Sequence, residues 1–66
     1  MYVIANIDNT LFVSDDSMRL VVTLQDAHVY TEYAWAEAVC NYNKTRKGTL
    51  LSQMVFVRRV SLKLEG

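Results

Sequence analysis

The sequence predicts a small α+β fold, an antiparallel sheet in the order β-β-(β)-α-β with one amphipathic helix packed on one face. Three observations predict it: a β-branched run at the N-terminus that ends in turn residues, an alanine-rich middle segment with helical spacing, and an alternating apolar run near the C-terminus. The 66 residues make a single domain, 1–66.

The N-terminal segment predicts a β-hairpin. Residues 2–7 are apolar and rich in β-branched side chains, and Asp8-Asn9 tolerates the left-handed backbone of a tight turn. Residues 10–14 form the returning strand, with Leu11 and Val13 on one face and Phe12 on the other. A solvated loop with two aspartates follows at 15–17.

The segment 19–30 has a mixed pattern. Residues 20–23 have the composition of a strand, 24–27 fit a single helical turn, and 28–31 are again typical of extended chain. We therefore expect a strand or strand-like segment within 19–30.

An amphipathic helix is predicted over 32–43. Thr31 suits the N-cap, and Glu32 in the first turn interacts favourably with the helix dipole. Trp35, Val39 and Tyr42, spaced by four and three residues, form an apolar stripe flanked by small side chains.

Polar residues complete the helix pattern: Glu37, Asn41 and Lys44 line the side opposite the stripe. The cations of 44–47 and then Gly48 end the helix.

The C-terminal segment predicts a long strand over 54–64, after a stretch at 49–53 that fits helix or strand. Period-two alternation gives the strand two faces. One carries Met54, Phe56, Val60, Leu62 and Leu64, and the other carries Val55, Val57, Arg59, Ser61 and Lys63. Arg58 is an exception, because it falls on the apolar face.

The size of the chain favours association. A domain this small buries only about 60% of its unfolded surface, so such domains commonly add disulfides, a metal or oligomerisation. Cys40 is the only cysteine and His28 the only histidine, so we expect no disulfide within the chain, no metal site and no cofactor. A homodimer or higher oligomer remains, and the apolar content of 52% supports it. The interface candidates are Trp35, Tyr42 and Phe56.

No run approaches the roughly 18 apolar residues of a membrane span, and the first residues lack the positive charge of a signal peptide. We expect a cytoplasmic protein without a membrane partner.

Two motifs suggest catalysis, and each has a simpler interpretation. The run 4–11 resembles the first motif of haloacid-dehalogenase-like phosphatases, matching it at Asp8, Thr10 and Leu11. The position of the family's nucleophile is occupied by Asn6, which cannot form an aspartyl-phosphate, and a hairpin turn explains the run. Cys40 and His28 contain the groups of a nucleophile and a base, but a cysteine in the middle of a helix is typically buried and inert. We expect no enzymatic activity.

Charge is polarised along the chain although the net charge is zero. Six of the seven basic residues lie in the last 23 positions, and six of the seven acidic residues lie in the first 37. Exposed loops concentrate this charge, which suits steering toward a complementary protein surface. The partner-binding candidates are Asp15, Asp16, Lys44, Arg46 and Lys47.

Nucleic acid is a second hypothetical partner, bound through the cations of 44–47, but the zero net charge disfavours it. A third hypothesis is an oligomer that sequesters a small ligand between its subunits.

In layout, the chain resembles a recurrent type of small phage-encoded protein. The resemblance is carried by the opening Tyr2-Val3-Ile4, the hairpin, Leu24-x-Asp26-Ala27-x-x-Tyr30, the alanine-rich helix and the closing Val55-Phe56-Val57. Such proteins often bind and block a host factor, including proteins of bacterial immunity. The resemblance therefore implies a phage inhibitor that binds a host protein in the host cytoplasm.

Overall fold

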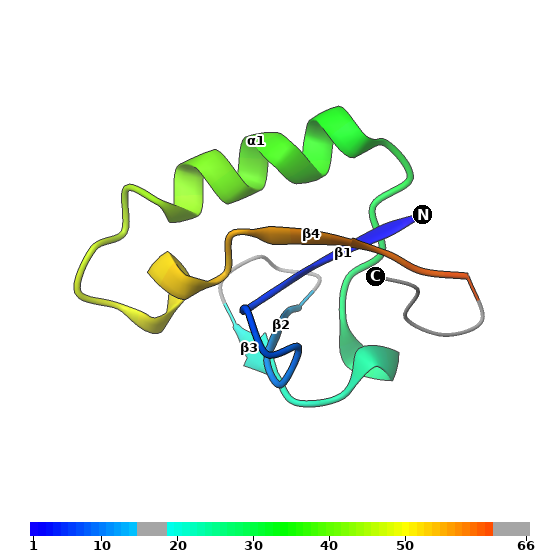
Figure 1. Cartoon of the computed structure of the whole chain (residues 1–66), viewed down its shortest axis with the longest axis horizontal. Helices are drawn as coiled ribbons and strands as arrows, with labels where there is room; N and C mark the ends of the chain where they lie inside the picture. The colour runs from blue at the N-terminus through cyan, green and yellow to red at the C-terminus, as the bar shows by residue number, and fades with distance from the viewer. Residues whose placement is uncertain (15–18, 62–66) are drawn as a thin grey trace.

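The computed structural model describes residues 1–14 and 19–61, and it has the α+β architecture that the sequence predicts (Figure 1). Its elements are, in order, β1 (Tyr2–Ala5), β2 (Phe12–Val13), β3 (Leu20–Val21), the 3₁₀ turn η1 (Leu24–Asp26), α1 (Tyr33–Asn43), the 3₁₀ turn η2 (Leu50–Gln53) and β4 (Phe56–Arg59). The four strands form one antiparallel sheet in the order β3-β2-β1-β4.

The first and last strands of the described chain lie side by side, with β1 inside the sheet and β4 at its edge. Tyr2 pairs with Arg59, and Ala5 pairs with both Phe56 of β4 and Phe12 of β2. At its N-terminal end, β1 also pairs with the chain that leads into α1: Tyr2 and Tyr30 exchange two backbone hydrogen bonds of 2.8 and 2.7 Å. This bridge fixes where the helix begins relative to the sheet.

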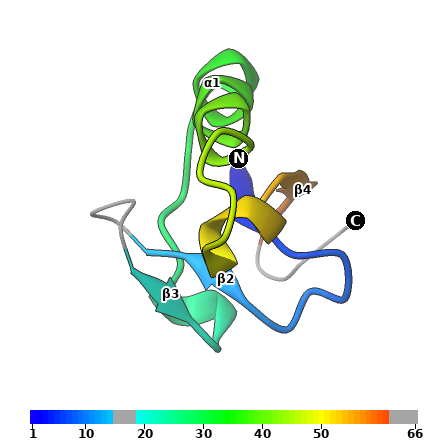
Figure 2. The same ribbon diagram turned by 90° about the vertical axis from the view of Figure 1, so that its left-hand side faces the viewer.

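Each face of the sheet carries apolar side chains, because alternate residues of β1 point to opposite faces. The helix-side core lies under α1 and η2, and the far-side core lies on the face that η1 covers (Figure 2). The helix-side core comprises Ile4, Val13, Tyr30, Ala36, Cys40, Leu51 and Met54. The far-side core comprises Val3, Ala5, Phe12, Ala27 and Val60. As predicted, Leu11 and Val13 belong to one face and Phe12 to the other.

The hairpin turn is held by a side chain. Asn9 has the left-handed backbone expected of this turn, with φ of 59°. The amide of Asn6 bonds to Thr10 and Leu11: its Oδ1 accepts from their backbone N–H groups at 2.9 and 3.1 Å, and its Nδ2 donates to the Thr10 hydroxyl at 2.9 Å.

The mixed segment 19–30 contains the expected strand-like residues, Leu20–Val21, and the expected single turn, Leu24–Asp26. The undecided segment 49–53 is the 3₁₀ turn η2, which brings Leu51 into the helix-side core.

The helix begins one residue later than predicted and buries a different face. Its N-cap is Glu32, without a side-chain capping bond, instead of Thr31. The buried face is Ala36, Cys40 and Asn43. Of the predicted apolar stripe, only Val39 packs partly into the helix-side core, and Trp35 and Tyr42 are exposed. The amide Nδ2 of Asn43 donates to the carbonyl of Met54 at 2.7 Å, which secures the last turn of the helix over η2.

The C-terminal strand is shorter than predicted and is apolar on both faces. β4 spans four residues, and Val57, assigned to its polar face, packs against the helix-side core. Val60 lies in the far-side core, and its N–H donates to the carbonyl of Met1 at 2.9 Å. Positions 62–64 of the predicted strand lie outside the described residues.

Candidate protein-interaction surface on the helix

One side of α1 presents an apolar strip that the fold does not cover. Trp35, Ala38, Val39 and Tyr42 follow the spacing i, i+3, i+4, i+7, so they lie on one face over successive turns. The side chains of Trp35 and Tyr42 are 58% and 52% exposed, Ala38 is exposed, and Val39 packs partly into the helix-side core. We call these four residues the helix flank.

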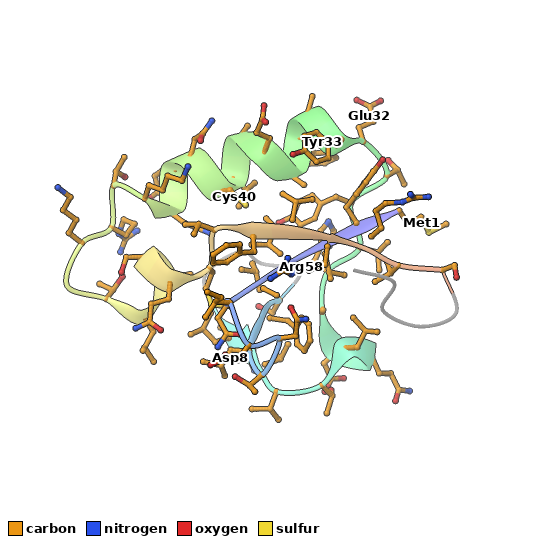
Figure 3. The ribbon with its side chains drawn as sticks, viewed as in Figure 1. Met1, Asp8, Glu32, Tyr33, Cys40 and Arg58 are labelled. Atoms are coloured by element: carbon orange, nitrogen blue, oxygen red, sulfur yellow. The ribbon has the colours of Figure 1, made fainter. Side chains whose placement is uncertain are left out.

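The flank is exposed because smaller side chains make the contact with the sheet. Ala36 and Cys40 face the strands, and Cys40 points from α1 toward them (Figure 3). Short side chains let a helix axis approach its neighbour closely, which leaves no room for an indole or phenol ring between the two layers. The large rings at 35 and 42 are therefore displaced to the side.

Trp35 is exposed but supported by the residues just before the helix. Its ring meets that of Tyr30 edge to face, with centroids 5.8 Å apart, and that of His28 at 6.5 Å. The His28 and Tyr30 rings are themselves 4.5 Å apart, and Tyr30 is only 2% exposed. A fixed ring thus supports Trp35, so little conformational entropy remains to be lost when a partner covers it.

Tyr42, at the other end of the flank, is paired with a cation. Nη1 of Arg46 donates to the Tyr42 hydroxyl at 2.9 Å, and the guanidinium carbon lies 5.8 Å from the ring centroid. Arg46, a predicted partner-binding residue, therefore lies beside Tyr42, a predicted interface residue. Lys44 and Lys47 are exposed in the same turn.

The remaining predicted site residues lie elsewhere. Phe56 pairs with Ala5 and so shares the far face of the sheet, where Arg58 covers it with 5.0 Å between guanidinium carbon and ring centroid. It does not form one surface with Trp35 and Tyr42. Asp15 and Asp16 lie outside the described residues.

The sequence did not single out Ala38 or the His28–Tyr30 support of Trp35. Ala38 could have been found from its spacing, three residues after Trp35. The support depends on the bridge to β1, for which the sequence carries no local signal.

Neither catalytic motif is arranged for chemistry. Both polar atoms of the Asn6 side chain, Oδ1 and Nδ2, are engaged in the hairpin turn, and Asp8 lies at its exposed tip (Figure 3). Burial raises the pKa of the Cys40 thiol from 9.0 to about 11; the nearby charge of Lys44 lowers it slightly and that of Glu37 raises it. The thiol is therefore protonated at neutral pH, whereas the nucleophilic form of cysteine is the thiolate.

Within 1–14 and 19–61, no three His, Cys, Asp or Glu side chains come together as a metal site would require. The helices in those ranges are all too short or too polar to cross a membrane.

No protein-family model, curated protein or solved structure matches the chain.

Proposed function

We propose that this chain is a non-enzymatic protein–protein interaction module and that the helix flank is its contact surface. One observation carries the proposal: two aromatic side chains, seven residues apart on one helix, are each more than half exposed while their neighbours hold them in place. Trp and Tyr are the residues that most often dominate the energy of protein interfaces.

The chemistry of the flank supports a protein partner. It is apolar along its length and has a guanidinium at one end, a composition typical of an interface centre with a charged rim. Among the other large exposed apolar side chains of the described residues, Tyr33 lies on α1 but off the flank, and Ile7 and Val22 lie on loops. The flank is the place where such side chains recur at helical spacing.

A separate proposal follows from the resemblance to small phage-encoded proteins: as a homo-oligomer, the chain also binds and blocks a host protein, through the charged residues beside the flank. The cations beside the flank suit an acidic partner, because opposite charges speed association and fix orientation.

Site-specific photo-crosslinking tests whether the flank is the contact surface. A photoreactive phenylalanine analogue at Ala38, in the centre of the flank, is expected to give discrete crosslinked products in cells of the natural host. The same analogue at Val22, which is 73% exposed, is the matched control and is expected to give none.

A second variant identifies the groups responsible. Trp35→Ala combined with Tyr42→Ala is expected to abolish the products from position 38. The folded state, checked by far-UV circular dichroism, should be retained because exposed side chains contribute little to stability. Absence of products at 38, or their persistence in the double variant, would contradict the proposal. Products that nuclease removes would show a nucleic-acid partner instead.

A further inference from the structure

We propose that the occupant of the helix flank is a second copy of this chain, whose α1 lies antiparallel to the first across a two-fold axis between Ala38 and Val39. The inference rests on the proposed function, because it names the partner of the same surface.

The flank is complementary to itself in this register. With the axis between positions 38 and 39, Trp35 of each copy faces Tyr42 of the other, and Ala38 faces Val39. The small side chain of Ala38 allows the two helices to approach closely at the axis. The rings at 35 and 42 then fill the space on either side of it, and aromatic pairs of this kind add attraction beyond their buried area.

Charge selects the antiparallel direction. Glu32 is exposed at the N-terminal end of α1 (Figure 3), and Arg46 lies beside Tyr42 at the C-terminal end. In the antiparallel register Glu32 of each copy approaches the other copy's turn 44–47, and the two helix dipoles oppose each other favourably. A parallel arrangement would instead bring the two basic turns together.

Self-association through the β4 edge of the sheet is less favourable. β4 is an edge strand, so two copies could pair there. Such a pairing would gather Arg58 and Arg59 of both copies in one short ribbon, where like charges repel. The helix flank is the self-complementary surface without this conflict.

The contact is small, which sets the expected affinity. A fully buried aromatic side chain covers about 150–250 Å², so four half-exposed rings remove roughly 400 Å² from water. Interfaces below about 1,200 Å² are typical of transient complexes. We therefore expect a dimer with a dissociation constant in the micromolar range or weaker.

Sedimentation velocity between about 10 μM and about 1 mM covers the range expected of such a transient interface. The wild-type chain is expected to shift from monomer to dimer across this range, and Trp35→Ala with Tyr42→Ala is expected to stay monomeric. Tyr33→Ala is the matched control: Tyr33 is 50% exposed on the same helix but packs against Tyr2 and lies off the flank, so this variant should dimerise as the wild type does.

Two further variants test the geometry. Ala38→Cys places a thiol next to the two-fold axis and is expected to form a disulfide-linked dimer on mild oxidation, whereas Glu37→Cys, at an exposed position on the opposite side of the helix, is not. The buried Cys40 does not compete. Glu32→Arg is expected to weaken the dimer several-fold, and its combination with Arg46→Glu to recover part of the loss.

A wild-type chain that is monomeric up to about 1 mM, beyond the range of specific transient complexes, overturns the inference. Dimerisation that persists in the double aromatic variant also overturns it. If the chain is monomeric but position 38 still crosslinks to another protein, the second-copy inference fails and the proposed function stands. If both signals are absent, both fail.

Discussion

At the scale of single residues, Asn6 explains why the most suggestive motif of the chain has a structural role. It lies between β1 and the hairpin tip, is 7% exposed, and its amide bonds to Thr10 and Leu11 on the other arm of the loop. Its backbone N–H also donates to the Leu11 carbonyl at 3.2 Å. The side chain therefore closes the loop that joins the first two strands.

Replacement of Asn6 should reveal which of its atoms matter. Asn6→Ala leaves the N–H groups of Thr10 and Leu11 without their acceptor and is expected to lower the free energy of unfolding by about 1–3 kcal/mol. Asn6→Asp keeps that acceptor and loses only the amide donor, so its loss at pH 7 should be smaller. Urea denaturation measures both; equal losses in the two variants would mean that the acceptor contributes nothing.

At the scale of elements, α1 separates its packing face from its apolar stripe. The packing face is Ala36, Cys40 and Asn43, while the rings of Trp35 and Tyr42 lie on the flank. Hydrophobic periodicity marks apolar residues but does not say which of them a neighbouring layer has room for. Here the close approach of helix and sheet selects the small side chains.

The assignment of the packing face predicts that substitution by leucine lowers the stability at Ala36 but not at Ala34. Ala36 is fully buried against the sheet, so Ala36→Leu should force the helix and sheet apart at a cost of about 1–3 kcal/mol. Ala34 is exposed, and Ala34→Leu should change stability by less than about 0.5 kcal/mol. Thermal or urea unfolding compares them, and similar losses would contradict the assigned face.

At the scale of the whole molecule, the chain is closed by contacts between its two ends. β4 pairs along the length of β1, and Arg58 links the strand to the hairpin loop. Its Nε donates to Oδ1 of Asn9 at 2.9 Å, its Nη2 approaches the carbonyl of Ile7 at 3.4 Å, and its guanidinium lies over Phe56. The arginine that breaks the strand pattern in sequence thus joins segments 49 residues apart.

Neighbouring arginines provide a matched test of this link. Arg58→Ala removes the contacts to Asn9 and Phe56 and is expected to cost about 1–2 kcal/mol. Arg59→Ala, at an exposed position, should cost less than about 0.5 kcal/mol. Arg58→Lys keeps the charge but lacks the planar fork, so it should recover only part of the loss. Equal effects of the two alanine variants in urea denaturation would show that the link is not stabilising.

Folding brings the basic C-terminal part of the described chain close to its first half. The antiparallel pairing of β1 and β4 brings the basic C-terminal strand beside the first half of the chain, and Arg58 is engaged there by neutral groups. Arg46 is engaged by Tyr42. Of the three predicted partner-binding cations, all of which the structure describes, Lys44 and Lys47 make no such side-chain contact. They are exposed at the end of the helix flank.

The sequence by itself determined the class of the fold, the hairpin with its left-handed turn, the existence of the helix and the buried character of Cys40. These features depend on local backbone preferences and on spacing within one element, which neighbouring residues encode. It also determined that the chain carries more large apolar side chains than its small interior holds.

Only the tertiary structure decided which of those side chains remain exposed. The bridge between Tyr2 and Tyr30 sets the position of α1, and the short side chains of Ala36 and Cys40 set its distance from the sheet. Trp35 and Tyr42 are exposed as a consequence of these two contacts. Each contact joins residues distant in sequence, so no local pattern specifies it, and the helix flank follows from how the layers fit together.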